Sequence, residues 1–202
     1  MQFPDSRILI FAKAPEAGRV KTRLIAALGA QGAADFYRRL LDSTVERAAG
    51  ALLAPVECCC TPTVEHAVFS GLAARHGVAL TLQAGDDLGA RMQNSAQHAL
   101  AGCSSLLLIG ADCPALLPRH MARALDWLRQ GQDAVLGPAE DGGYVLLGLK
   151  QAPAELFSDI PWGSSRVLEM TRQRLQRLGW RWRELEPLWD VDRAEDLARM
   201  GH

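Results

Sequence analysis

Residues 105–109 read Ser-Leu-Leu-Leu-Ile, and residues 110–114 continue as Gly-Ala-Asp-Cys-Pro. An uninterrupted apolar run of this length, ended by a turn, is typical of a strand that is buried on both faces, as the strands of a parallel sheet are. In open sheets of this kind, ligands bind outside the carboxyl ends of the strands. Asp112 follows the run at once, and an unpaired charge is costly to bury. The stretch therefore predicts a parallel sheet with a polar site facing Asp112.

Further strands and helices alternate on both sides of this run. Thr63 and either Ser164 or Ser165 are the expected caps of two of the helices. The expected strands are 7–12, 56–61, 78–82, 105–109, 133–137, 144–149 and 180–185, and the expected helices are 31–49, 63–76, 90–100, 118–129, 165–178 and 193–200. This alternation predicts an α/β fold in one domain over residues 1–202, with a mixed, mostly parallel sheet and helices on both faces. The strands 133–137 and 144–149 have a short connection, which permits a locally antiparallel pair.

The composition argues against several classes of protein. Of the 202 residues, 49% are hydrophobic, and 22 basic residues against 23 acidic ones give a net charge of -1. This balance argues against a nucleic-acid or membrane-surface binder, and the sequence has no apolar run of about 18 residues that would span a membrane. The five cysteines are odd in number, and Cys58–Cys60 are consecutive, which suits neither a disulfide framework nor a zinc site. Since a signal peptide is also lacking, we expect reduced core cysteines in a cytoplasmic protein.

The loop after the first predicted strand is basic. It carries four basic residues and one acid, in a chain with no basic excess overall: Lys13, Arg19, Lys21 and Arg23, with Glu16. Gly18 lets the backbone approach a ligand closely, and the first amides of the next helix would face an anion. The loop therefore predicts a diphosphate site, although a solvated basic turn explains the same residues. A P-loop is excluded, because Pro15 and Val20 stand where that motif needs glycine.

Acidic residues supply the candidate metal ligands. Magnesium and manganese are held by one or two carboxylates together with substrate phosphates. Asp112 suits this role. Asp190 and Asp192 lie two residues apart on an extended segment, so their side chains would point the same way and could provide a second ligand to the cation. Capping of the next turn by Asp112 and of the last helix by Asp192 are the structural alternatives.

Two further segments contain candidate ligand contacts. Asp141, Gly142, Gly143 and Tyr144 would present a carboxylate and backbone amides to an acceptor, although a glycine turn is an equal alternative. Asp86 and Asp87 could contact a nucleotide or simply cap the following helix. A dinucleotide-binding glycine motif and a nucleophile elbow are both lacking.

Taken together, these segments resemble one family. They are Phe11-Ala12-Lys13-Ala14-Pro15, Gly18-Arg19-Val20-Lys21-Thr22-Arg23-Leu24, Gly110-Ala111-Asp112-Cys113-Pro114, Asp141-Gly142-Gly143-Tyr144 and Trp189-Asp190-Val191-Asp192. The family is that of small bacterial GT-A-fold transferases, formerly a domain of unknown function and now often called arsenosugar-biosynthesis or radical-SAM/selenodomain-associated glycosyltransferases. The resemblance covers nearly the whole chain. It implies a nucleotide-diphospho-sugar transferase fold with the nucleotide over the first half of the sheet.

The resemblance also implies roles for particular residues. A divalent cation, Mg²⁺ or Mn²⁺, would bind Asp112 and be shared with Asp190 or Asp192, while the basic loop would hold the donor phosphates. One position departs from the pattern, because Gly110 stands where many glycosyltransferases of this fold carry the first aspartate of an Asp-x-Asp motif.

A more distant resemblance points to a different reaction. Lys21-Thr22-Arg23-Leu24 is similar to an element of 2-phospholactate guanylyltransferase, which attacks a nucleoside triphosphate and releases pyrophosphate. We expect a metal-dependent glycosyltransferase that uses a nucleotide-sugar donor and a small-molecule acceptor, with Asp141 orienting or deprotonating the acceptor hydroxyl. A nucleotidyltransferase is the alternative, and a non-catalytic nucleotide-binding domain is a third. The sequence does not indicate an oligomeric state.

Overall fold

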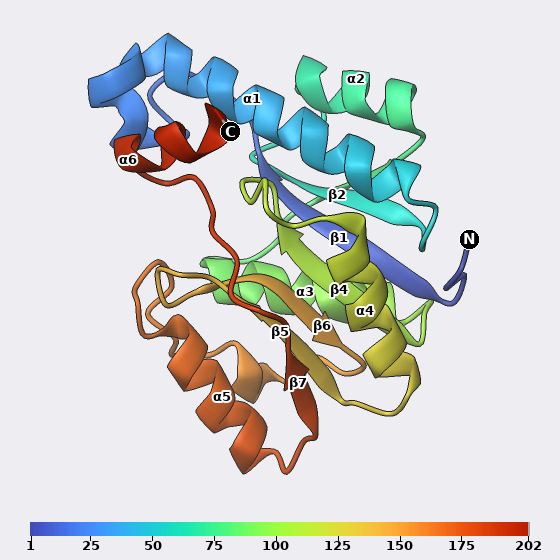
Figure 1. Ribbon diagram of the computed structural model, residues 1–202. Coiled ribbons are helices and arrows are strands. Elements are labelled where there is room, and N and C mark those ends of the chain that lie inside the picture. Colours follow the sequence, from blue (N-terminus) through green and yellow to red (C-terminus); the bar gives the residue numbers. More distant parts are fainter. Residues whose placement is uncertain (202) are drawn as a thin grey trace.

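The chain forms one seven-stranded sheet in the order β3-β2-β1-β4-β6-β5-β7 (Figure 1). The computed structural model describes residues 1–201. The strands are β1 (Ser6–Lys13), β2 (Val56–Thr61), β3 (Ala79–Leu82), β4 (Ser105–Gly110), β5 (Ala134–Pro138), β6 (Tyr144–Leu149) and β7 (Trp182–Glu184). The helices are α1 (Ile25–Gly50), α2 (Ala67–His76), α3 (Leu88–Leu100), α4 (Pro118–Arg129), α5 (Val167–Arg177) and α6 (Ala194–Leu197), with 3₁₀ turns η1 (Thr22–Leu24), η2 (Ala154–Leu156) and η3 (Ala198–Gly201).

The sheet is mixed because of one strand. Strand β6 lies between β4 and β5 and is antiparallel to both, whereas the other neighbouring strands run parallel. The loop between β5 and β6 is too short for a crossover helix, so β6 has to return beside β5. This confirms the predicted α/β fold with a mixed, mostly parallel sheet and the antiparallel pair within it.

Helices cover both faces of the sheet, as predicted. One core cluster packs α1, α2 and α4 against one face, and a second packs α3 and α5 against the other. Neighbouring strand residues divide between the two clusters: Ile8 and Ile10 belong to the first, and Leu9 belongs to the second. Cys58–Cys60 divide in the same way, which confirms that they are core residues.

Helix α1 matches its prediction well, except at its start. The helix formally begins at Ile25, but Gly29 has non-helical angles (φ 70°, ψ 165°) that interrupt it. The regular part therefore starts close to the predicted residue 31. Residues that recur at helical spacing along the predicted stretch 31–49 are all buried: Ala33, Phe36, Tyr37, Leu40, Leu41, Thr44 and Val45.

Two predicted helix caps are wrong. Helix α2 begins at Ala67 with His66 as its cap, and helix α5 begins at Val167. Thr63 and Ser164 instead accept hydrogen bonds from the backbone amides two residues ahead, in small turns that precede each helix. Serine and threonine favour such turns as much as caps, so sequence reasoning placed the start of each helix too early.

Within the described residues, no helix is both long and apolar enough to cross a bilayer.

The cysteines give a test of the core. All five are free thiols, and burial raises the pKa of Cys58, Cys59, Cys60 and Cys113 to about 12. These thiols are therefore protonated and shielded from reagents. We expect Ellman's reagent at neutral pH to modify at most the half-buried Cys103 in the native protein and all five cysteines after unfolding. Rapid modification of three or more in the native protein would contradict this packing.

Candidate active site

Three adjoining hollows lie at the carboxyl edge of the parallel strands. A cavity of about 310 Å³ lies between α3, β4, β6 and the segment before α5. A groove of about 410 Å³ follows the basic loop after β1, and a third hollow of about 430 Å³ lies beside the C-terminal segment. Asp112 lines both the cavity and the groove, while Asp141 and Asp190 line both the cavity and the third hollow. The three hollows therefore form one continuous depression.

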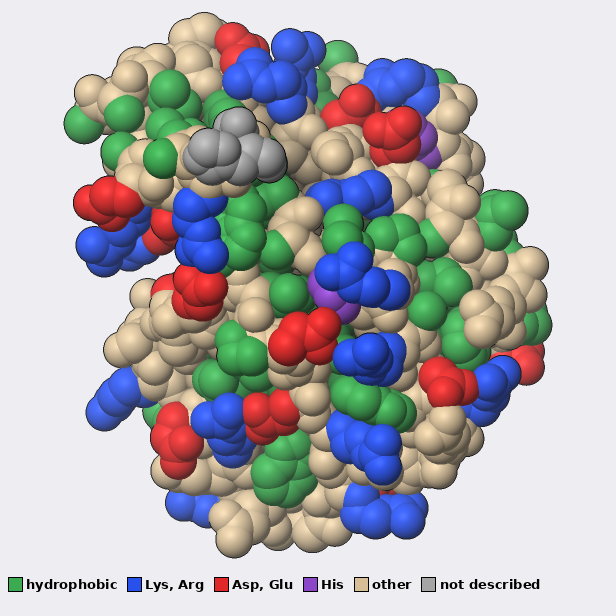
Figure 2. Space-filling model, in the orientation of Figure 1, with side chains coloured by type: hydrophobic (Ala, Val, Ile, Leu, Met, Phe, Trp, Pro, Cys, Tyr) green, Lys and Arg blue, Asp and Glu red, His purple; other side chains and the backbone are tan. Residues whose placement is uncertain are grey.

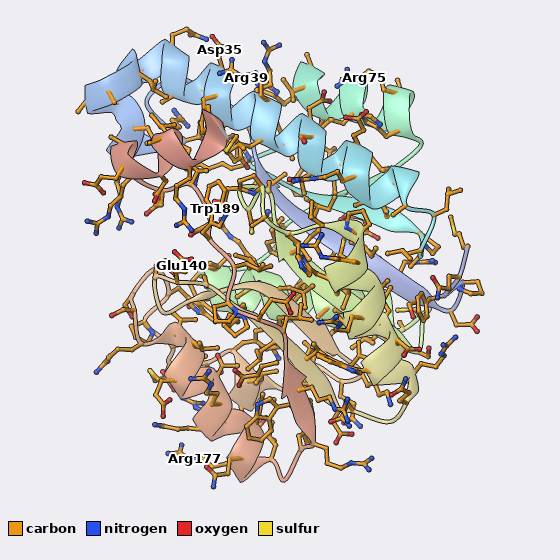
Figure 3. The ribbon with its side chains drawn as sticks, viewed as in Figure 1. Asp35, Arg39, Arg75, Glu140, Arg177 and Trp189 are labelled. Carbon is orange, nitrogen blue, oxygen red and sulfur yellow. The ribbon has the colours of Figure 1, made fainter. Side chains whose placement is uncertain are left out.

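The C-terminal segment brings Asp190 and Asp192 to this depression. It leaves β7, crosses the carboxyl edge of the sheet and ends beside α1 (Figure 1). The backbone amide of Val191 donates to the carbonyl of Asp112, and the Cys113 thiol donates to the carbonyl of Trp189. Figure 3 shows Trp189 on this segment close to Glu140, which lies on the loop between β5 and β6. The segment therefore joins the two halves of the sheet at the site.

Charged side chains are also visible from outside the molecule. Figure 2 shows acidic and basic groups interspersed over the displayed face, with no large area of one sign. This agrees with the net charge of -1. A ligand would therefore be attracted by the local charged clusters around Asp112 and not by the charge of the whole surface.

Lys21 is the buried cation of the site. Its side chain is 7% exposed, and its Nζ lies 2.8 Å from Oδ2 of Asp112 and 3.8 Å from Oδ1 of Asp192. Its backbone is left-handed (φ 45°, ψ 45°), a conformation that costs a non-glycine residue roughly 1–2 kcal/mol. The ion pairs hold this conformation, because it turns the ammonium group away from solvent and toward the carboxylates.

The other basic residues of the loop lie along the same groove. Arg23 pairs with Asp192, and Arg19 pairs with Glu16 at 3.2 Å. The amide of Lys13 donates to the Tyr37 hydroxyl, which also lines the groove. The structure thus brings the four predicted phosphate-binding side chains together, but it directs Lys21 to the carboxylates. Gly18 has φ 78°, a conformation that glycine adopts readily.

The carboxylate of Asp190 is buried among like charges. Burial, together with the like charges of Asp112 and Asp141, raises the pKa of Asp190 to about 6. Lys21 opposes this effect only in part. Asp112, Asp141 and Asp190 therefore lie together on the wall of a cavity whose described lining includes no basic side chain, which is an arrangement that a divalent cation would stabilise.

The donor set fits a cation that is shared with a ligand. Among residues 1–201, no group of three or more His, Cys, Asp or Glu side chains is arranged to hold a metal ion by itself. Asp112 and Asp190 fit the usual magnesium arrangement, in which one or two carboxylates bind together with substrate phosphates. Asp192 fits less well, because it already pairs with both Lys21 and Arg23.

Asp192 also does not cap the last helix. Arg193 is the cap residue of α6, and the carboxylate of Asp196 accepts from the amides of Asp192 and Arg193. The helix cap thus lies one residue later than the sequence suggested.

The segment from Asp141 to Tyr144 forms the expected turn and still faces the cavity. The amide of Gly143 donates to Oδ1 of Asp141 at 2.9 Å. Gly142 has φ 90°, and its carbonyl accepts from the amide of Leu168. Asp141, Gly143 and Tyr144 all line the cavity. The turn and the acceptor-binding interpretations are therefore compatible, because the turn places these residues on the cavity wall.

The structure separates Asp86 and Asp87 from the depression. Oδ1 of Asp87 accepts from the amide of Ala90 and caps α3, which confirms the structural alternative for this residue. Neither aspartate lines the cavity, the groove or the third hollow.

The apolar wall of the cavity was not predicted from the sequence. Phe11, Leu88, Met92 and Trp162 all line it, and the Trp162 ring meets the Tyr144 ring edge to face with centroids 6.4 Å apart. Leu88 and Met92 are four residues apart, a spacing that could have indicated one apolar helix face, but the predicted helix began only at residue 90. Trp162 had no such signal, because it comes from a separate loop.

A close contact explains why glycine stands at position 110, two residues before Asp112. A Cβ atom on Gly110 would lie 2.9 Å from Oδ1 of Asp112, so a side chain there would displace the carboxylate. Helix α1 fixes the loop that follows: Arg47 donates to the carbonyl of Pro114 at 2.7 Å, and Thr44 lies 3.4 Å from the carbonyl of Ala111. Gly110, Thr44 and Arg47 therefore determine where the Asp112 carboxylate lies.

The comparisons with known proteins agree with this architecture. The family model described as an uncharacterized protein conserved in bacteria (DUF2064) matches residues 44–164, more than half of the chain. The chain belongs to the DUF2064 family. A solved structure from Desulfovibrio desulfuricans, provisionally described as a nucleotide-diphospho-sugar transferase, is 33% identical, with a TM-score of 0.87 over 98% of this chain and 86% of that one. A search of the curated proteins found no significant match.

More distant solved structures share the fold. A cytidylyltransferase from Leptospira borgpetersenii is 15% identical, with a TM-score of 0.64 over 98% of this chain and 85% of that one. Glucosyl-3-phosphoglycerate synthase from Mycobacterium tuberculosis, solved with Mn²⁺, UDP and its product, is 12% identical, with a TM-score of 0.59 over 98% of this chain and 75% of that one. The fold of this DUF2064 protein is thus that of the nucleotide-diphospho-sugar transferases, as predicted.

The turn at Gly142 gives a prediction about the cavity wall. A Cβ atom on Gly142 would lie 2.3 Å from the Ser165 carbonyl oxygen, whereas Gly163, with a similar φ of 81°, has open space. We expect Gly142→Ala to lower the free energy of unfolding by about 2–4 kcal/mol and Gly163→Ala by about 1 kcal/mol, as measured in urea. Equal losses in the two variants would contradict the close contact between the turn and Ser165.

The raised pKa of Asp190 gives a prediction about pH. Because the folded carboxyl has a pKa of about 6 and its ordinary value is 3.8, folding becomes less favourable as pH rises through that window. We expect Asp190→Asn to stabilise the metal-free protein by on the order of 2 kcal/mol near pH 8, and by less than half as much near pH 4.5. Urea unfolding in EDTA measures this. A stabilisation that is independent of pH, or a destabilisation at pH 8, would show that Asp190 is not under electrostatic strain.

Proposed function

We propose that this DUF2064 protein is a divalent-metal-dependent transferase that moves a glycosyl group from a nucleotide-sugar to a small hydroxyl compound. The observation that carries the proposal is the position of Asp112. This carboxylate lies on the boundary between a basic groove and a largely apolar cavity. The diphosphate of a nucleotide donor suits the basic groove, and a small acceptor suits the apolar cavity. Their reacting atoms would therefore meet beside Asp112.

The basic groove supports a diphosphate donor. Arg19 and Lys13 are exposed along the groove. The Tyr37 hydroxyl accepts a hydrogen bond from the Lys13 amide and can donate its own proton in a hydrogen bond to a phosphate oxygen. Desolvation raises the pKa of Tyr37 above its ordinary value, so this phenol is a donor and not an anion at neutral pH. Donor groups held in place in this way would offset the charge that develops on the departing phosphate.

Asp112 and Asp190 would hold the cation together with the donor phosphates. When bound, Mg²⁺ or Mn²⁺ supplies Lewis-acid stabilisation of the leaving diphosphate. Lys21 holds the Asp112 carboxylate in place through their ion pair, and its own charge adds to that stabilisation. Glucosyl-3-phosphoglycerate synthase, which shares the fold, was solved with Mn²⁺ and UDP together, and this supports the pairing of metal and nucleotide.

The acceptor step uses Asp141. The acceptor hydroxyl oxygen forms a bond to the anomeric carbon of the donor, and the bond from that carbon to the phosphate oxygen breaks. The proton passes to Asp141, and the nucleoside diphosphate leaves. Asp141 lines the cavity, and only one of its oxygens accepts a hydrogen bond from Gly143, so the other oxygen can orient the acceptor.

A nucleotidyltransferase is the second candidate, and Gly110 favours it. Glycine stands where an Asp-x-Asp motif has its first aspartate, and a Cβ atom here would lie 2.9 Å from Oδ1 of Asp112, so a side chain at this position would have to move that carboxylate. In this reaction an acceptor oxygen attacks the α-phosphorus of a nucleoside triphosphate and pyrophosphate leaves. The sequence similarity to 2-phospholactate guanylyltransferase and the fold of the cytidylyltransferase agree with it.

A donor panel distinguishes the two reactions. Purified protein is mixed with nucleotide-sugars or nucleoside triphosphates and Mn²⁺, and thermal stability and product release are measured. A ligand at a hundred times its dissociation constant stabilises a protein by ~2.7 kcal/mol. We expect one nucleotide-sugar to raise Tm only with Mn²⁺ and to release nucleoside diphosphate. Pyrophosphate release from a triphosphate would favour the second candidate, and the absence of any metal-dependent response would contradict both.

A matched pair of variants controls this experiment. We expect Asp112→Asn to remove the metal-dependent Tm increase and to lower turnover at least 100-fold, because it removes a cation ligand. Asp86→Asn makes the same substitution at an exposed aspartate outside the depression and should leave both unchanged. Equal effects of the two substitutions would show that Asp112 does not hold the metal.

A further inference from the structure

We infer that the acceptor carries no negative charge and places an apolar face against Trp162. The inference rests on the proposed function, because it assigns the 310 Å³ cavity on one side of Asp112 to the acceptor. It goes further by stating which hydroxyl compounds the cavity admits and which it rejects.

The charge of the cavity wall excludes anions. Three carboxylates line it, those of Asp112, Asp141 and Asp190. Of the described residues that line the cavity, none is lysine, arginine or histidine. The basic residues of the first loop lie along the groove on the other side of Asp112, where Lys21 is paired with that carboxylate. The adjoining third hollow is lined by Arg23, Arg193 and Arg199, of which Arg23 pairs with Asp192 and Arg199 pairs with Glu140. A phosphate or carboxylate on the acceptor would therefore face the Asp141 carboxylate with no basic side chain of this cavity to bind it, and it would compete with the donor phosphates for the metal proposed at Asp112 and Asp190.

The rest of the wall is apolar and partly aromatic. Trp162 and Tyr144 meet edge to face, with an interplanar angle of 89°, so part of each ring surface faces the cavity they line. Further apolar lining comes from β1, α3, β4, β6 and the start of α5: Phe11, Leu88, Met92, Leu108, Ile109, Val145 and Val167. Aromatic rings of this kind bind aryl groups and the C–H faces of sugars.

Gly89 fixes where Trp162 lies. A Cβ atom on Gly89 would lie 2.5 Å from Nε1 of Trp162, so only glycine in the first turn of α3 admits the indole. The indole therefore packs closely against the first turn of α3. Since the cavity of about 310 Å³ is at the lower end of the range for small-molecule sites, a single sugar or aryl ring is the appropriate size.

Matched pairs of neutral and negatively charged compounds test whether the cavity rejects anions. Isothermal titration of the intact protein with Mn²⁺ compares methyl glucoside with its 6-phosphate, phenyl glucoside with its 6-phosphate, and 4-hydroxybenzyl alcohol with 4-hydroxybenzoate. We expect at least one neutral member to bind and its charged counterpart to bind at least tenfold more weakly. Equal or tighter binding of the charged members, or no binding by any neutral member, would overturn the inference.

A pair of tryptophan variants tests whether the neutral ligand binds in the cavity. We expect Trp162→Ala to weaken the neutral ligand at least tenfold and to leave the metal-dependent donor response unchanged. Trp127, which lies on α4 beneath Arg183 and outside the cavity, is the control, and Trp127→Ala should change neither. Equal effects of the two variants would overturn the assignment.

The same measurements separate the two proposals. If a donor binds with metal but charged acceptors are preferred, the acceptor inference fails and the transferase proposal stands. If neutral ligands bind through Trp162 but no nucleotide responds to metal, the transferase proposal fails and the cavity assignment stands.

Discussion

The site depends on three carboxylates that line one cavity, in a described lining that includes no basic side chain. Asp112 extends from the end of β4, Asp190 comes from the C-terminal segment, and Asp141 comes from the turn before β6. The buried ammonium group of Lys21 pairs with Asp112 from the side of the groove, and the Lys21 backbone has a left-handed conformation there. Such an arrangement is costly in a protein that only folds, because like charges raise its free energy. It is reasonable in one that binds a cation and a phosphorylated ligand.

The mixed sheet explains how these residues meet. In a fully parallel sheet, the strand beside β4 would begin at the opposite edge from Asp112. Because β6 is antiparallel to β4, its first residue, Tyr144, lies at the edge where β4 ends. The turn that carries Asp141 therefore lies beside Asp112. The same reversal divides the depression into two chemically different parts, with basic side chains on the side of β1 and aromatic ones on the side of β6.

Local patterns in the sequence predicted the elements, the mixed sheet and most of the residues that meet at the site. The apolar run 105–109 identified the central strand, and the spacing along 31–49 identified the buried face of α1. Helix starts were less predictable, because Thr63 and Ser164 form turns that resemble caps. The direction of Lys21 toward Asp112 depends on a contact between residues 91 positions apart, which no local pattern contains. The aromatic wall was missed for the same reason, since Trp162 and Met92 come from different parts of the chain.

The central claim is that the carboxylates around Asp112 hold a divalent cation jointly with a nucleotide diphosphate. Its most direct test is Mn²⁺ binding followed by electron paramagnetic resonance, with and without UDP. Because the described residues offer few ligands of their own, Mn²⁺ should bind weakly alone and at least tenfold more tightly with UDP, and UDP should gain the same factor from Mn²⁺. Mn²⁺ binding that is unaffected by UDP, or no binding in either case, would contradict the account.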